Sequence, residues 1–257
     1  MTFLFSETIF GPVRSRRFGN SLGINLLPND YKVCTYDCVY CECGYTLVPP
    51  EKKEDLPMRE HVAESLEKRL KRMLREGEFP DSITFAGNGE PTLHPAFPGI
   101  MDDTIALRNK YFPQAKITVL SNASRVHRKE IRTALLKADH NVLKLDAGLE
   151  STFHLINRPP KGLTLQQVVE NLMHFRGNLI VQTMFVKGHI DGKAIDNTTP
   201  EETTAWLSLL LKIKPQLVMI YSIARETPAE GLVPVPHTQL HNIAQMVINA
   251  GLNAEIY

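Results

Sequence analysis

The residues with the clearest chemistry are three cysteines, Cys34, Cys38 and Cys41, which stand within eight residues of one another. A fourth cysteine, Cys43, follows two positions later, and the chain has no other. Thiolates are the usual ligands of iron–sulfur clusters, which ordinarily take four of them. Three thiolates on one short loop therefore suit three irons of a [4Fe–4S] cube. The fourth iron is then left open, as catalytic metal sites leave a position open.

The alternative for this loop is a zinc site that uses Cys43 as its fourth ligand. The intervals of three, two and one residues are cramped for tetrahedral zinc, which usually gathers its ligands from two separated pairs. The pattern therefore favours the cluster. For Cys43 two roles stay open: a bystander thiol beside the cluster, or a hydrogen donor or substrate-linking group.

Short apolar runs alternate with longer stretches of helical spacing along the chain, which predicts an α/β fold with a parallel sheet. We expect strands over residues 21–27, 82–86, 116–121, 142–146, 179–186 and 217–221, and helices over 61–76, 98–110, 128–137, 163–175, 200–213 and 238–249. A single domain over residues 1–257 is predicted, with residues 1–20 before the first core strand and a cluster loop over 28–45.

Polar and glycine-rich residues follow successive predicted strands at the same end. Functional sites of parallel βα folds collect where the strands reach their carboxyl ends. We therefore expect one pocket there. Its candidate residues are the three cysteines, Gly87, Asn88, Gly89, Glu90, Ser121, Asn122 and Asp146.

Bulk composition excludes several classes of protein. With 29 Lys and Arg against 28 Asp and Glu the net charge is +1, so no strong overall field attracts a polyanion. Four clustered cysteines are unlike a secreted disulfide framework. The N-terminus lacks the pattern of a signal peptide, and no apolar run approaches the roughly 18 residues of a membrane span. A cytoplasmic protein that is not bound to a membrane is expected.

The spacing Cys34-x3-Cys38-x2-Cys41, with aromatic Tyr40 directly before the last cysteine, resembles the cluster motif of the radical S-adenosylmethionine (SAM) superfamily. The resemblance covers nearly the whole chain and also rests on the Gly87–Glu90 segment and the order of strands. It implies a partial (β/α)6 barrel of the TIM type, with a [4Fe–4S] cluster whose open iron binds SAM. It further implies reductive cleavage of SAM, hydrogen abstraction by a 5′-deoxyadenosyl radical, and an electron donor such as flavodoxin or ferredoxin.

The same resemblance assigns roles to the residues of the expected pocket. The segment that corresponds to Gly87–Glu90 binds the amino group of SAM, and Asn88 stands there in place of the commoner glycine. The backbone near Tyr40 would meet the adenine, and Ser121 with Asn122 would meet the carboxylate or ribose. Asp146 is a candidate partner of ribose or substrate.

Residues 11–25, 38–44, 144–147 and 157–159 resemble a wyosine-synthase-like subgroup that includes tRNA-modifying enzymes. The compact basic cluster Arg14, Arg16 and Arg17 suits phosphate, because guanidinium groups bind phosphate oxygens in pairs. An RNA substrate is therefore the first hypothesis. A peptide, protein or small metabolite is the second, and a metal- or SAM-binding protein without radical turnover is the third.

Overall fold

One sheet organises the computed structural model of the chain, which describes residues 3–47 and 56–257. Its strands are β1 (Ile9–Ser15), β2 (Gly19–Ile24), β3 (Ser82–Phe85), β4 (Lys116–Ser121), β5 (His140–Lys144), β6 (Ile180–Ile190), β7 (Lys193–Asp196), β8 (Leu217–Ser222), β9 (Leu232–Pro234) and β10 (Ala254–Ile256). The helices are α1 (Arg59–Glu76), α2 (Phe97–Tyr111), α3 (Lys129–Leu135), α4 (Glu150–Asn157), α5 (Leu165–Met173), α6 (Pro200–Ile213) and α7 (His237–Asn249), with a short 3₁₀ turn at Pro91–Leu93.

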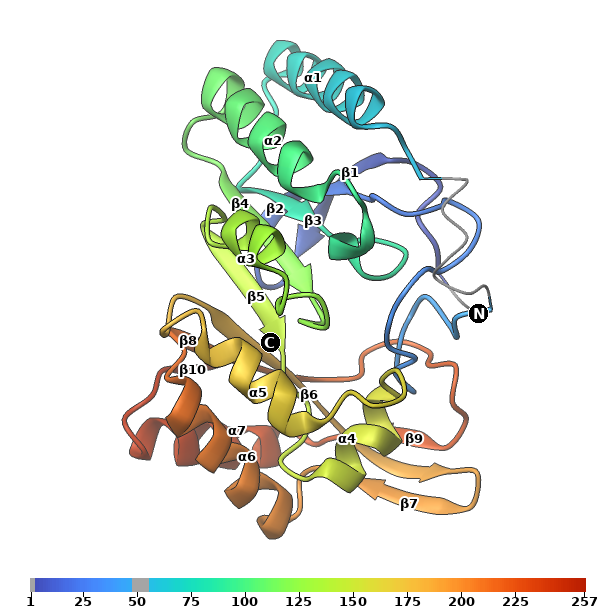
Figure 1. Ribbon diagram of the computed structural model, residues 1–257, viewed down its shortest axis with the longest axis vertical. Helices are drawn as coiled ribbons and strands as arrows, with labels where there is room; N and C mark the ends of the chain where they lie inside the picture. The colour runs from blue at the N-terminus through green and yellow to red at the C-terminus, as the bar shows by residue number, and fades with distance from the viewer. Residues whose placement is uncertain (1–2, 48–55) are drawn as a thin grey trace.

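The strands run in the order β1-β2-β3-β4-β5-β6-β8-β10, and all neighbours after β2 in this order pair in parallel. β1 pairs antiparallel with β2 and forms one edge. Within the described residues the sheet stays open between β1 and β10, and the helices lie outside its curved wall (Figure 1). The predicted α/β class and partial barrel are confirmed.

Local signals explain where two of the helices begin: α6 matches its predicted bounds, and α5 begins and ends two residues inside the predicted 163–175. α6 begins after Thr199, whose side chain accepts a hydrogen bond from the Glu202 backbone, and Pro200 occupies the first helical position. α5 begins with a reciprocal capping box between Thr164 and Gln167. These residues satisfy backbone donors that a helix start leaves unpaired.

The inner face of the sheet positions the candidate site. In the register of the sheet, Lys144 lies opposite Gln182, and Gln182 lies opposite Met219. Phe18, from the turn between β1 and β2, packs in a small buried cluster with Met219 and Val142. The turn therefore folds onto the inner face and fills part of the barrel interior.

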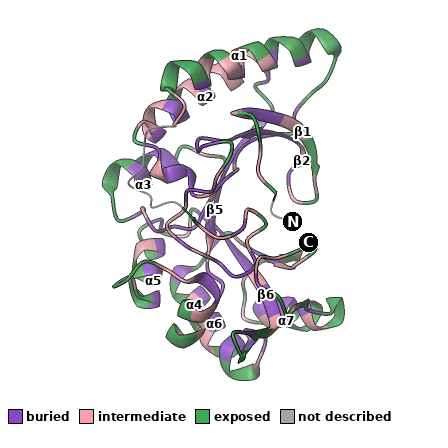
Figure 2. Ribbon diagram, turned by 90° about the vertical axis from the view of Figure 1, so that its right-hand side faces the viewer, coloured by how far each residue is buried: buried purple, intermediate pink, exposed green. Residues whose placement is uncertain are grey.

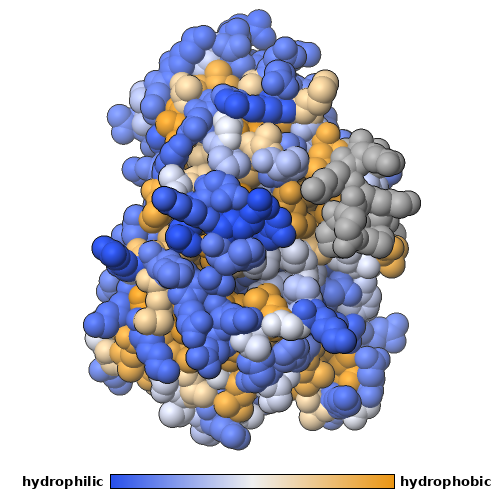
Figure 3. All heavy atoms as spheres, in the orientation of Figure 1, coloured by the Kyte–Doolittle hydropathy of each residue, from blue (hydrophilic) through white to orange (hydrophobic). Residues whose placement is uncertain are grey.

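The outer surface of the wall is polar. Figure 2 shows buried strands at the centre and exposed outer sides of the helices. On the face drawn in Figure 3, hydrophobic residues are scattered among hydrophilic ones, as is usual for protein surfaces. Among the described helices, none combines the length and apolar character needed to cross a membrane.

Candidate functional site

The predicted residues converge on one cavity at the carboxyl ends of the strands. Its walls include most of the predicted set: Cys34, Cys38, Cys41, Tyr40, Gly87, Gly89, Glu90, Ser121 and Asn122. It is also lined by Lys32, Tyr36, Cys43, Leu120, Lys144 and Gln182. Asn88 and Asp146 lie behind this wall, where both are buried.

Two asparagine side chains hold the cysteine loop. Asn122 Nδ2 donates to Cys34 Sγ at 3.4 Å, and Asn157 Nδ2, at the end of α4, donates to Cys38 Sγ at 3.4 Å. Burial raises the pKa of Cys34 to about 12 and also raises the pKa of Cys38. Buried thiols of this kind bind iron as thiolates, so a bound cation would supply the charge that keeps them ionised.

Lys32 places a positive charge beneath the same loop. Its side chain is almost completely buried, and Nζ donates to the Gly44 carbonyl at 2.8 Å and lies 3.3 Å from Asp37 Oδ1. Burial alone lowers the pKa of Lys32, but the facing cysteines and Asp37 raise it above its ordinary value. The ammonium group therefore stays charged and favours thiolates in the loop.

Cys43 lies between the cysteine loop and the Gly87–Glu90 segment. Its Sγ donates to the Gly87 carbonyl at 3.4 Å. The neighbouring Cys43 lowers the pKa of Cys41 to about 6, and Cys41 in turn raises the pKa of Cys43. Among the described residues, no group of three or more His, Cys, Asp or Glu side chains is placed around a single metal ion.

Glu90 is a buried carboxylate, 1% exposed, with hydrogen-bond donors but no cationic partner among the described residues. Oε1 accepts from the Thr92 backbone and hydroxyl and from Ser121 Oγ at 2.8 Å. Within the described part of the chain, Oε2 accepts only from the Asn122 backbone, at 2.6 Å. Burial raises the pKa of Glu90 despite these bonds. A carboxylate has about four acceptor sites, so Oε2 keeps capacity for an ammonium group.

Gly87 and Gly89 adopt backbone conformations that favour glycine, and together they form a backbone surface in the cavity wall, here called the cradle. Their φ values are +140° and +141°, in a region that side chains rarely allow. A Cβ on Gly89 would lie 1.8 Å from the Val33 carbonyl. Between them, the Asn88 side chain turns away, donating to Phe5 and Pro28 carbonyls and accepting from the Phe5 backbone. Asn88 thus anchors the N-terminal segment.

Tyr40, Lys144 and Asp146 form a buried chain beside the cavity. Lys144 Nζ donates to Tyr40 Oη at 2.6 Å, Tyr40 Oη donates to Asp146 Oδ2, and Lys144 lies 3.3 Å from that oxygen. Asp146 also accepts from Asn157 at 2.6 Å and from the Met184 backbone at 2.9 Å. Burial lowers the pKa of Lys144, but Asp146, Tyr221 and Cys38 together outweigh it and the pKa is raised. Asp146 therefore orients Tyr40 and Lys144 from behind.

Tyr36 carries a polar atom that has no partner among the described residues. The residue is 2% exposed, and its hydroxyl makes no hydrogen bond. Burial, and then the nearby Cys38 and Glu90, raise the pKa of this hydroxyl well above its ordinary value. Buried polar groups are ordinarily paired, so the unpaired hydroxyl of this cavity-lining residue is a candidate contact of a bound group.

The residues present fit a [4Fe–4S] cluster with bound SAM. Cys34, Cys38 and Cys41 line one cavity. The Glu90 carboxylate has no cationic partner among the described residues and suits the SAM ammonium. Gly87 and Gly89 allow the backbone to come close to a ligand. Sequence reasoning missed Lys32, Tyr36 and the role of Asn157. Lys32 stands two residues before Cys34 and Tyr36 two residues after it. Neither residue type binds the cluster directly, so only the folded structure shows that both line the cavity.

The basic cluster is divided by the fold. Arg14 and Arg16 are exposed, whereas Arg17 turns inward and donates from one guanidinium nitrogen to Gln182 Oε1 at 2.9 Å. The guanidinium of Arg17 also stacks 5.0 Å from the centre of the Tyr221 ring. Gln182 faces inward, since it lines the cavity.

Two proteins named UPF0026 are similar to this chain over more than two thirds of its length. UPF0026 protein MJ1312 of Methanocaldococcus jannaschii is 36% identical over 181 residues, 69% of this chain and 53% of that protein. UPF0026 protein slr1464 of Synechocystis is 30% identical over 227 residues, 86% of this chain and 77% of that protein.

A third relative, named GTPase Obg, from Brachyspira hyodysenteriae, is 32% identical over 231 residues, 88% of this chain but 31% of that protein. This chain thus spans about a third of that relative and about half of the Methanocaldococcus protein. The present sequence contains no Gly-x4-Gly-Lys-Ser/Thr phosphate loop, so the GTPase name describes that longer relative.

Solved structures share the fold at low sequence identity. A radical SAM methyltransferase from Sphaerobacter thermophilus superposes with a TM-score of 0.63, 13% identity, and coverage of 92% of this chain and 65% of that chain. Archaeal TYW1 gives a TM-score of 0.58, 14% identity, and coverage of 89% and 71%. The family model described as the Radical SAM superfamily, whose members use a [4Fe–4S] cluster and SAM, matches residues 29–196. This chain belongs to the radical SAM superfamily.

Proposed function

We propose that this protein is a radical SAM enzyme that holds its [4Fe–4S] cluster through Cys34, Cys38 and Cys41 and acts on RNA. The cluster and SAM part of this proposal rests on one observation: the three cysteines line the same cavity as the Glu90 carboxylate, which has no cationic partner among the described residues. When bound and reduced by a donor such as flavodoxin or ferredoxin, the cluster and SAM supply a 5′-deoxyadenosyl radical that abstracts hydrogen from the substrate.

The protein's own residues would bind SAM and orient it in the cavity. Glu90 Oε2 would accept from the SAM ammonium, while Gly87 and Gly89 allow the backbone to approach it. Lys144, held charged by Asp146, would present its ammonium to a carboxylate or hydroxyl in the cavity. The apolar side of Leu120 and the Tyr36 ring exclude water from the reacting centre.

The RNA part rests on the hairpin between β1 and β2 and on the likeness to the tRNA-modifying subgroup. Arg14 and Arg16 are exposed on this hairpin, and the next residue, Arg17, reaches Gln182 in the cavity wall. A phosphate-bearing substrate that approaches the cavity from this side meets guanidinium groups first.

The test is anaerobic reconstitution with iron and sulfide, followed by dithionite and SAM. We expect 5′-deoxyadenosine, and a higher yield when bulk tRNA is added. The Glu90→Gln variant should keep its cluster absorbance but bind SAM roughly tenfold more weakly, because a charged hydrogen bond is lost. Absence of 5′-deoxyadenosine under every condition supports a binding protein without turnover. Stimulation by peptides or metabolites, but not by RNA, supports the second substrate class.

A further inference from the structure

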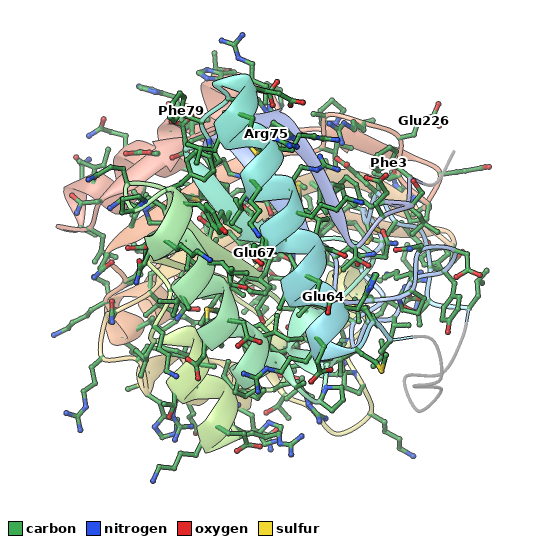
Figure 4. The ribbon with its side chains drawn as sticks, turned by 90° about the horizontal axis from the view of Figure 1, so that it is seen from above. Phe3, Glu64, Glu67, Arg75, Phe79 and Glu226 are labelled. Atoms are coloured by element: carbon green, nitrogen blue, oxygen red, sulfur yellow. The ribbon has the colours of Figure 1, made fainter. Side chains whose placement is uncertain are left out.

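A groove of about 450 Å³ lies between α1 and the edge strand β1, outside the cavity. Six of its lining residues come from α1, and five of these follow one another at intervals of three or four, which places them on one face of the helix. These five are His61, Ser65, Lys68, Arg72 and Arg75. Figure 4 shows α1 lying across the molecule, with Arg75 toward the end of the helix. One wall of the groove therefore carries three cations, Lys68, Arg72 and Arg75.

This positive charge is only partly neutralised. Lys68 and Arg75 make no ion pair within the part of the chain that the structure describes, and Arg72 lies 3.7 Å from Glu76. Glu7, the single acidic residue in the groove lining, is 63% exposed and lies 3.4 Å from Arg69. Like charges on neighbouring helical turns repel, so this arrangement is stabilised when an anion binds.

Arg69 argues against a peptide as the occupant. Its guanidinium group donates to the backbone carbonyls of Gly11 and, at 3.3 Å, Ile9. A peptide that extends the sheet at β1 would need those carbonyls as acceptors. Because Arg69 already occupies them, the groove offers cations rather than a free strand edge.

The dimensions of the groove suit an extended polyanion. From His61 to Arg75, α1 rises about 21 Å at 1.5 Å per residue. The cationic part of this face, from Lys68 to Arg75, covers about 10 Å of that rise. At the other wall, Asn29 Oδ1 accepts from Asn25 Nδ2 at 3.1 Å, and Asn25 packs against Gly87 of the cavity. One side chain thus separates the groove from the SAM cradle.

We propose that this groove binds the phosphate backbone of an RNA strand and leads that strand toward the cavity. The inference rests on the proposed action on RNA and adds the surface that holds it. Lys68, Arg72 and Arg75 provide the contacts to phosphate, which carry affinity without reading sequence. The net charge of +1 is compatible with this role, because the cations are gathered on one helix face.

The test is fluorescence anisotropy of the reconstituted protein with a labelled single-stranded RNA of twelve nucleotides, at 50 and 200 mM salt. Three phosphate contacts predict a loss of roughly 20-fold in affinity between these salt concentrations. The triple variant Lys68→Gln, Arg72→Gln, Arg75→Gln should abolish most of that salt dependence.

A matched control removes three positive charges elsewhere. In Lys71→Gln, Lys110→Gln, Lys137→Gln each lysine is exposed and already paired with an acidic residue, so RNA affinity should change less than twofold. Equal binding by wild type and the groove variant overturns the inference, as does tighter binding of poly-glutamate than of RNA. SAM cleavage without RNA, measured in parallel, reports the proposed function separately, because the groove variant should retain it.

Discussion

Replacing Tyr36 with phenylalanine should have opposite effects on the free and the cofactor-bound protein. The Tyr36 hydroxyl is buried and has no partner among the described residues. A buried polar group left unsatisfied costs about 1–3 kcal/mol. Without cofactors, Tyr36→Phe should therefore raise the free energy of unfolding by that amount. The melting temperature should rise by about 2–4 °C for each kcal/mol.

With the cluster and SAM bound, we expect the cofactors to supply the acceptor that this hydroxyl lacks. Loss of a hydrogen bond to a charged group costs about 1.5–3 kcal/mol. SAM should then bind roughly tenfold to a hundredfold more weakly to the reconstituted variant. Thermal unfolding of the cofactor-free protein and anaerobic calorimetric titration with SAM measure the two effects.

Tyr111→Phe is the matched control. The Tyr111 hydroxyl donates to Glu67 at 2.6 Å, so its removal breaks a bond that exists and should lower stability by about 1 kcal/mol. The reasoning is refuted if Tyr36→Phe destabilises the cofactor-free protein as Tyr111→Phe does and leaves the affinity for SAM unchanged.

Three further substitutions or conditions test other parts of the site. Gly89→Ala should cost at least about 1–3 kcal/mol in urea unfolding, because its φ of +141° and the nearby Val33 carbonyl exclude a Cβ; an unchanged midpoint contradicts this. Asp146→Asn should cost about 3–5 kcal/mol, since Lys144 then keeps a buried charge without its partner; a loss below 1 kcal/mol contradicts this. Burial lowers the pKa of His94, so the unfolded chain binds a proton more readily. The contribution of His94 to stability should be constant above pH 6.5 and fall by up to about 1.4 kcal/mol per pH unit below it. Burial also lowers the pKa of His140, so His94→Gln should reduce the observed slope without removing it.

Regular patterns made much of the fold predictable. The apolar runs that became β3, β4, β5, β6 and β8 are buried parallel strands, and such strands read as continuous hydrophobic segments. The strand predicted over residues 21–27 corresponds to β2, Gly19–Ile24, which begins two residues earlier and ends three residues earlier. β1 was missed because this edge strand carries Pro12, the charged Arg14 and a bulge between Phe10 and Val13. α4, β7, β9 and β10 were also missed, since each is short.

The site was predictable where chemistry depends on residue type. Cysteine spacing and the Gly87–Glu90 segment identified the cavity, and most of the predicted residues line it. The direction of a side chain was not predictable: Asn88 turns toward Phe5, and Asp146 acts through Tyr40 and Lys144. Whether the chain forms a single domain, and whether each predicted residue contacts SAM, stay predictions.

The most direct test of the central claim is the iron content and SAM cleavage of single cysteine variants after anaerobic reconstitution. If three thiolates hold the cluster, Cys43→Ala should retain about four irons per chain and produce 5′-deoxyadenosine. Cys34→Ala, Cys38→Ala and Cys41→Ala should each lose both. A Cys43→Ala protein that is colourless, or a wild-type protein that binds one zinc ion through all four sulfurs, would contradict the account.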